Sequence, residues 1–176
     1  MEPRVEPCDR EGMHRVRVFT LLLVLGFLAA TPAAALHARY LDIVVDRNGD
    51  ATVTFEYNLS FVEGFLSLLG AINPSRDIER IFAASTGQNT TTLSTADGST
   101  TFGVRGFATV VENDPSLTFA TVPVNLSWGQ AGYESSVIAP LLDPDFSPDS
   151  TVIRFPDAWS VTFHDLFLVP TVNHSF

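Results

Sequence analysis

The chain has 176 residues and a formal net charge of −10, with 20 acidic residues, ten arginines and no lysine. This length is typical of one domain, and 45% hydrophobic residues are enough for a core. Residues 1–35 hold four acidic and four arginine residues, so the whole net charge belongs to residues 36–176. Such an acidic surface repels phosphate groups, which excludes nucleic acid and disfavours anionic lipid as partners.

The N-terminal segment has the order of a secretory signal. Basic residues after Met13 precede an apolar run over residues 18–30, and the small residues at 33–35 resemble a cleavage site. The sequence therefore predicts a signal peptide over residues 1–35, with Met13 as an alternative start. The rest, residues 36–176, is expected to be one secreted or cell-surface domain. An uncleaved anchor is the alternative, because the uncharged run extends to Leu36.

Cys8 is the only cysteine, and it precedes the apolar run. A chain cut near Leu36 would contain no thiol. The prediction is therefore a domain without disulfides, thiol catalysis or cysteine-bound zinc.

The first element of the predicted domain is a hairpin over residues 39–61. Hydrophobic and polar residues alternate on both sides of the turn, which is typical of half-buried strands. A two-residue Asn48-Gly49 turn would place Val45 opposite polar Thr52. A three-residue loop over 47–49 instead pairs Val45 with Ala51 and gives Gly49 the left-handed position. We expect the three-residue loop.

Residues 61–70 are apolar and rich in glycine, and a short buried helix is expected there. Asn73 and Pro74 then form a helix start, and Gly87 ends an amphipathic helix predicted over residues 74–85. Four further strands are predicted at 90–94, 100–105, 107–112 and 117–128, the last with a break at Pro123, and a final hairpin is predicted over 151–164. These elements predict an α+β fold: a mainly antiparallel sheet of hairpins, with one or two helices inserted after the first hairpin and packed on one face.

Two loops have oxygen-bearing side chains at alternate positions, as calcium loops do. The first has Asp143, Asp145, Ser147 and Asp149, but Pro148 occupies the position that glycine holds in an EF-hand. The second has Asp46, Asn48 and Asp50, where hairpin geometry already explains Gly49. Calcium at residues 143–149 is kept as the one cofactor prediction beside the plainer interpretation, a solvated loop rich in proline and aspartate.

No reaction centre is recognisable, and no catalytic residue is assigned. His164 next to Asp165 is a candidate acid–base pair, with His174 as another base, but no nucleophile or metalloprotease motif accompanies them. An enzyme would bring at least two members of one set into a pocket: Asp143, Asp145, Asp157, His164 and Asp165. A binding protein would instead show an exposed apolar patch or an unpaired sheet edge.

Four sequons for N-glycosylation occur, at Asn58, Asn89, Asn125 and Asn173. The plainer interpretation is a β surface rich in Ser and Thr. Trp128, Tyr133 and Trp159 could line a sugar-binding face, but core packing is the expected role of each.

The hairpin turn Asp46-Arg47-Asn48-Gly49-Asp50 and the closing segment from Phe155-Pro156-Asp157-Ala158-Trp159 to Asn173-His174 resemble small exported proteins of methanogen-type archaea. This resemblance implies an archaeal source and an envelope or extracellular location, and it implies no activity.

Together these features predict an exported, non-enzymatic protein that binds envelope components or copies of itself. A small-molecule substrate is not expected. The alternatives are a secreted hydrolase or carbohydrate-binding module that uses Asp/Glu and His164, and a membrane-tethered ectodomain with an uncleaved N-terminal anchor.

Overall fold

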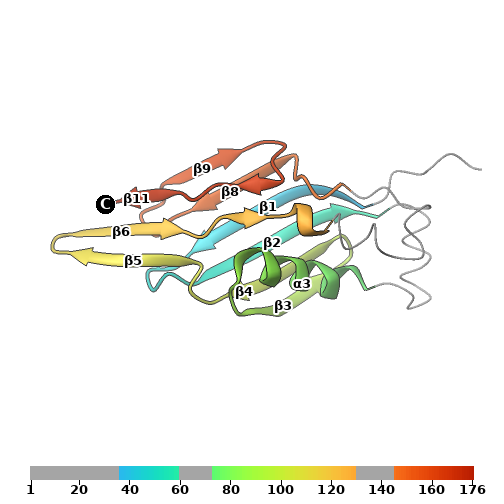
Figure 1. Cartoon of the computed structure of the whole chain (residues 1–176), viewed down its shortest axis with the longest axis horizontal. Helices are drawn as coiled ribbons and strands as arrows, with labels where there is room; N and C mark the ends of the chain where they lie inside the picture. The colour runs from blue at the N-terminus through green and yellow to red at the C-terminus, as the bar shows by residue number, and fades with distance from the viewer. Residues whose placement is uncertain (1–35, 60–72, 130–144) are drawn as a thin grey trace, which may run out of the picture. The chain divides into compact units, whose positions relative to one another are not determined.

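The computed structural model describes residues 36–59, 73–129 and 145–176. These residues form open, mostly antiparallel β-sheets with helix on one side, which confirms the predicted α+β fold (Figure 1). The predicted signal peptide over residues 1–35 and the predicted helix over 61–70 lie outside the described residues.

The main sheet has six strands in the order β3-β4-β2-β1-β8-β9. Its strands are β1 (His37–Val45), β2 (Ala51–Asn58), β3 (Thr90–Ala96), β4 (Ser99–Val104), β8 (Ser150–Arg154) and β9 (Ser160–Phe163). All neighbours are antiparallel except β1 and β8, which run in parallel and pair from Tyr40 with Ser150 to Val44 with Arg154. Because β1 and β8 run in the same direction, the turns that follow them lie at the same end of the sheet (Figure 1).

The β1–β2 turn is the predicted three-residue loop. Val45 pairs with Ala51 and Ile43 with Val53, and Asp46 donates its N–H to the Asp50 carbonyl at 2.8 Å. Gly49 has φ +85°, which glycine adopts at little cost. The β8–β9 turn has the same form, since Phe155 donates its N–H to Trp159 O at 2.8 Å across a loop of three residues.

The helix α3 (Pro74–Thr86) begins and ends where the sequence predicts. The Asn73 side chain accepts a hydrogen bond from the N–H of Arg76, and Gly87 closes the helix with a left-handed φ of +66°. Ile78 and Phe82 are buried and point at the sheet, where Phe82 meets Phe102 of β4 at 4.8 Å between ring centroids. The helix therefore covers the inner face of the sheet on the β3–β4 side.

Two smaller sheets complete the second layer. One has the order β11-β6-β5 and the other pairs β10 with β7. Their strands are β5 (Ala108–Asn113), β6 (Ser116–Thr121), β7 (Val124–Asn125), β10 (Leu168–Val169) and β11 (Asn173–Ser175). Phe119 of β6 meets Phe155, which follows β8, at 5.9 Å, so this layer covers the β8 side of the main sheet.

The predicted strand over residues 117–128 is wrong in its second half. The chain leaves β6 at Thr121, β7 has only two residues, and residues 127–129 are helical. Pro123 marks the break, because proline has no N–H to continue a strand ladder.

Candidate functional site

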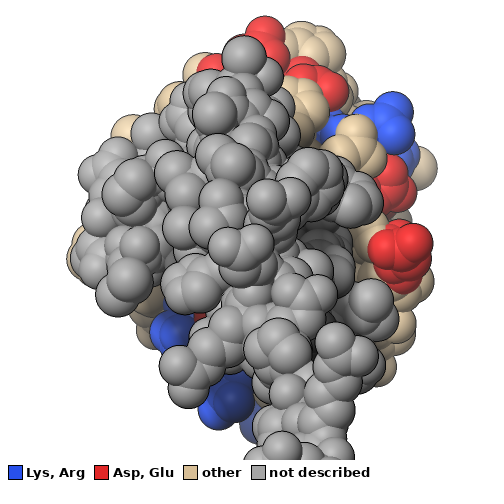
Figure 2. All heavy atoms as spheres, turned by 90° about the vertical axis from the view of Figure 1, so that its right-hand side faces the viewer, with Lys and Arg blue, Asp and Glu red and all other residues tan. Residues whose placement is uncertain are grey.

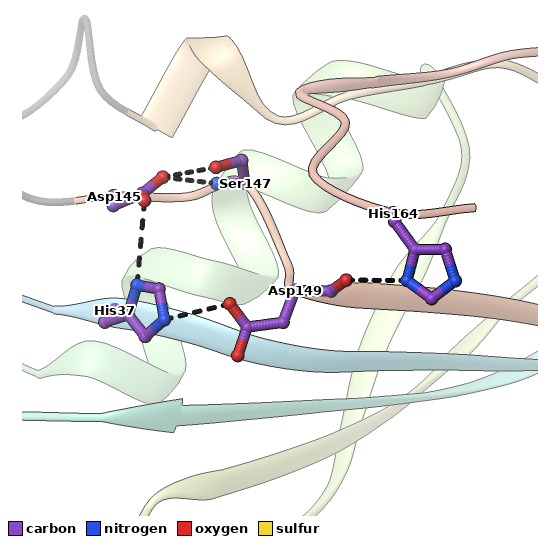
Figure 3. Close-up of polar contacts among 5 residues, drawn as sticks. All are labelled: His37, Asp145, Ser147, Asp149 and His164. Atoms are coloured by element: carbon purple, nitrogen blue, oxygen red, sulfur yellow. Dashed lines mark hydrogen bonds and ion pairs between the residues drawn. The ribbon is translucent and has the colours of Figure 1, made fainter.

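His37, at the start of β1, lies between two carboxylates of the loop before β8. Its Nε2 is 3.0 Å from Asp149 Oδ1 and its Nδ1 is 3.6 Å from Asp145 Oδ2 (Figure 3). Backbone pairing holds the loop there: Ala38 donates its N–H to Asp145 O at 2.9 Å, and Asp145 donates its own to Leu36 O at 2.7 Å. The cluster therefore ties the loop to the first residues of β1.

The predicted calcium loop is only partly visible, because Asp143 lies outside the described residues. Asp145 Oδ1 accepts hydrogen bonds from Ser147 N at 2.9 Å and from Ser147 Oγ at 2.5 Å, and Asp149 turns to His37 (Figure 3). The two ring nitrogens of His37 point in opposite directions, so one ion cannot bind this ring and both carboxylates. Within the described residues no group of three His, Cys, Asp or Glu side chains is placed to hold a metal ion. Calcium stays a prediction.

The second predicted loop holds the β1–β2 turn against the rest of the protein. Asn48 Nδ2 donates to Asp50 Oδ2 at 2.9 Å, and Asp50 Oδ1 accepts from the N–H of Gly106 at 2.8 Å. The Gly49 carbonyl accepts from the N–H of Ala108 at 2.7 Å. These contacts give Asn48 and Asp50 a structural role.

The proposed His164–Asp165 pair does not form a shared contact. His164 Nδ1 is 3.0 Å from the carbonyl oxygen of Asp149 (Figure 3), while the N–H of Asp165 reaches Pro148 O at 3.2 Å. Asp157 lies in the turn at the other end of β9, so it does not join His164.

The structure instead pairs Asp157 with His174. Asp157 Oδ2 is 2.7 Å from His174 Nε2, and its Oδ1 accepts the N–H of Trp159 at 3.1 Å. Desolvation acts to raise the pKa of Asp157, but the hydrogen bonds from His174 and Trp159 outweigh it, and the net pKa lies below its ordinary value. The pair therefore stabilises the fold at neutral pH, and this contribution is lost as the pH falls through the Asp157 pKa.

Aromatic rings surround this pair. Trp159 stacks on His174 with ring centroids 4.2 Å apart and planes 8° apart, and Phe155 lies 5.0 Å and Phe176 5.7 Å from the same imidazole. Trp159 is nevertheless 40% exposed, and Trp128 is 58% exposed. Core packing is therefore the wrong prediction for both tryptophans, and Tyr133 lies outside the described residues. The stack depends on His174 of β11, and no sequence pattern near Trp159 predicts that these two residues lie together.

A groove of about 480 Å³ lies between the β1–β2 and β8–β9 turns. We call it the two-turn groove. Its apolar lining comes from the end of β1, the residue that follows β8 and the β8–β9 turn: Val44, Val45, Phe155, Pro156 and Ala158. Its polar lining is Asp46, Arg47, Arg154 and Ser160. Its volume lies within the range of small binding sites, roughly 300–1,000 Å³.

The two guanidinium groups of the groove differ in their surroundings. Arg154 donates from Nε to Asp42 Oδ1 at 2.9 Å and from Nη2 to Tyr40 Oη at 3.2 Å, and the hydrogen bond to Asp42 raises the pKa of Arg154 further. Arg47 is exposed and forms no ion pair within the described residues. Arg154 is therefore held in place, while Arg47 is available to an anionic group.

Ala158 lines the groove in a backbone conformation that favours glycine. Its φ is +69°, whereas the equivalent residue of the β1–β2 turn is Gly49. We expect Ala158→Gly to raise the melting temperature by a few degrees, because the left-handed cost that it removes, about 1–2 kcal/mol, exceeds the cost of the extra unfolded-state entropy of glycine, about 0.4–1 kcal/mol. Thermal unfolding measures the change, and a lower melting temperature would contradict it.

The four sequon asparagines are distributed around the described surface. Asn58, Asn89 and Asn173 are exposed, and Asn125 is half-buried with its side-chain oxygen 2.7 Å from Ser127 Oγ. Glycosylation stays a prediction at all four.

Both acidic and basic side chains of described residues appear at the margin of the view in Figure 2. No helix of the described residues is long and apolar enough to cross a membrane. Protein-family models, curated proteins and solved structures yielded no match to this chain.

Proposed function

We propose that this is an exported, non-enzymatic protein that acts by contact, and that the two-turn groove is its contact surface. The single observation that carries the proposal is the composition of this groove: an apolar lining with two arginines and one aspartate, on a molecule of net charge −10. Six arginines are present in residues 36–176, and two of them lie in this groove.

An acidic group is the ligand that this arrangement favours. Arg154 is preoriented by Asp42 and Tyr40, so little conformational entropy is lost when a ligand binds beside it. Arg47 supplies a second charge, and the apolar side chains favour a ligand that also has apolar groups. Acidic components of the cell envelope and acidic segments of proteins meet this description.

The proposal is tested by fractionating producing cells into medium, envelope and cytoplasm. We expect the wild-type protein outside the cytoplasm and bound to the envelope. Arg47→Glu should move at least about tenfold more protein into the medium, because a like charge in a contact costs several kcal/mol. The matched control is Arg39→Glu, an exposed arginine of β1 that does not line the groove.

Two outcomes would overturn the proposal. Wild-type protein found in the cytoplasm would contradict the export. Equal amounts of Arg47→Glu, Arg39→Glu and wild-type protein in the medium would contradict a role of the groove in binding the envelope.

A further inference from the structure

The β5–β6 hairpin projects beyond the other strands, at the end of the molecule where the C-terminus lies (Figure 1). Its turn is Asp114-Pro115, since Asn113 pairs with Ser116. We call residues 111–115 the hairpin tip. All five are exposed, and Val111 is 48% exposed.

The tip is acidic and partly apolar. It has two carboxylates, Glu112 and Asp114, and it has no basic residue. Neither carboxylate forms an ion pair or a side-chain hydrogen bond with any residue of the described ranges. Val111 and Pro115 add apolar surface that water covers in the isolated chain. Such a projecting hairpin has the chemistry of a segment that enters a binding site.

The two-turn groove has the complementary chemistry. Arg47, which forms no ion pair within the described residues, is opposite in charge to the two tip carboxylates, and Val44, Pro156 and Ala158 offer an apolar surface. Arg154 is already paired with Asp42, and Asp46 also lines the groove. Complementary charge of this kind directs association and fixes its register.

The tip cannot occupy the groove of its own chain. The N–H of Ala108 is bound to Gly49 O at 2.7 Å, so β5 begins beside the β1–β2 turn. Asp114 lies six residues further along an extended hairpin, roughly 20 Å away at about 3.4 Å per residue. The hairpin thus carries its acidic groups away from the arginine of its own turn.

We infer that the hairpin tip of one copy binds the two-turn groove of a second copy. This inference rests on the proposed function, because it names the acidic partner of the same groove. Both features lie at the same end of the molecule, so a twofold axis allows each copy to insert its tip into the other and to form two identical contacts. The predicted assembly is a dimer joined through these ends.

The test measures the mass of the exported protein in solution by sedimentation over a range of concentrations. We expect a dimer for wild type and for the control Arg39→Glu. Arg47→Glu and Glu112→Arg should each be monomeric, with association weakened at least about tenfold. High salt should weaken the wild-type dimer, because it screens exposed ion pairs.

Mixing the two charge-reversed variants is the decisive arm. In the mixture, each groove meets a tip of opposite charge on the other variant, so the dimer should re-form. A mixture that stays monomeric, or a wild-type protein that is monomeric at every concentration, would overturn the inference. A monomer that still binds the envelope through Arg47 would overturn the inference and leave the proposed function standing.

Discussion

Gly49→Ala should lower the melting temperature by roughly 10 °C or more, at about 2–4 °C for each kcal/mol lost. An alanine Cβ at this position would lie 2.1 Å from the carbonyl oxygen of Ala108 and 3.0 Å from Val110 Cγ2. Because the nearest atom belongs to the backbone of Ala108 and not to a flexible side chain, the β1–β2 turn and the start of β5 must move apart. The left-handed φ adds about 1–2 kcal/mol, and the Ala108–Gly49 hydrogen bond, about 1 kcal/mol, is strained or lost.

Gly87→Ala is the matched control for this experiment. Gly87 has a similar φ of +66°, but a Cβ there meets no atom within 4 Å. It should lose only the conformational part, about 1–2 kcal/mol. Equal losses for the two variants in thermal or urea unfolding would show that the turn does not contact Ala108.

Phe82→Ala should destabilise the fold by about 3–5 kcal/mol, the range found for large-to-small changes at buried aromatic residues. Phe82 is fully buried, and its ring lies against Phe102 at an angle of 60°. Its removal takes away the main contact between α3 and the sheet and leaves a cavity on the β3–β4 side. A loss of this size is a large part of the stability of a domain, typically about 5–15 kcal/mol.

Phe167→Ala provides the control, because Phe167 is 38% exposed. It should change the free energy of unfolding far less than Phe82→Ala does. Urea unfolding measures both variants, and a loss below about 1 kcal/mol for Phe82→Ala would contradict the packing of α3 on the sheet.

Local patterns were sufficient to predict the three-residue β1–β2 turn and the helix. The β1–β2 register follows from keeping Val45 opposite Ala51, because a slip of one residue would turn every core side chain toward water. The bounds of α3 follow from Asn73 and Gly87. The Asn73 side chain accepts a hydrogen bond from a free N–H of the first turn, and the left-handed Gly87 donates its N–H to the Ala83 carbonyl of the last turn.

The parallel pairing of β1 with β8 has no such local signal. Val44 and Arg154 are neighbours across this pair although 110 residues separate them. A buried strand pattern does not name its partner, so the sequence could not predict that the two turns lie together or that His37 lies between Asp145 and Asp149. The two-turn groove depends on this pairing, and for that reason the sequence could not predict the groove.

Trp159 shows a different limit of pattern reasoning. It is in phase with Val161 and Phe163, which are half-buried against the core, but it precedes β9 and lies at the turn. There His174 of β11 covers one face of its ring, and the ring remains 40% exposed.

The most direct test of the account is hydrogen–deuterium exchange of the protein, compared between dilute free protein and protein mixed with cell envelope. The account predicts slower exchange of backbone amides in residues 44–47 and 154–160, the two segments that contain the lining residues of the two-turn groove. Unchanged exchange in both segments, with protection confined to other parts of the surface, would contradict it.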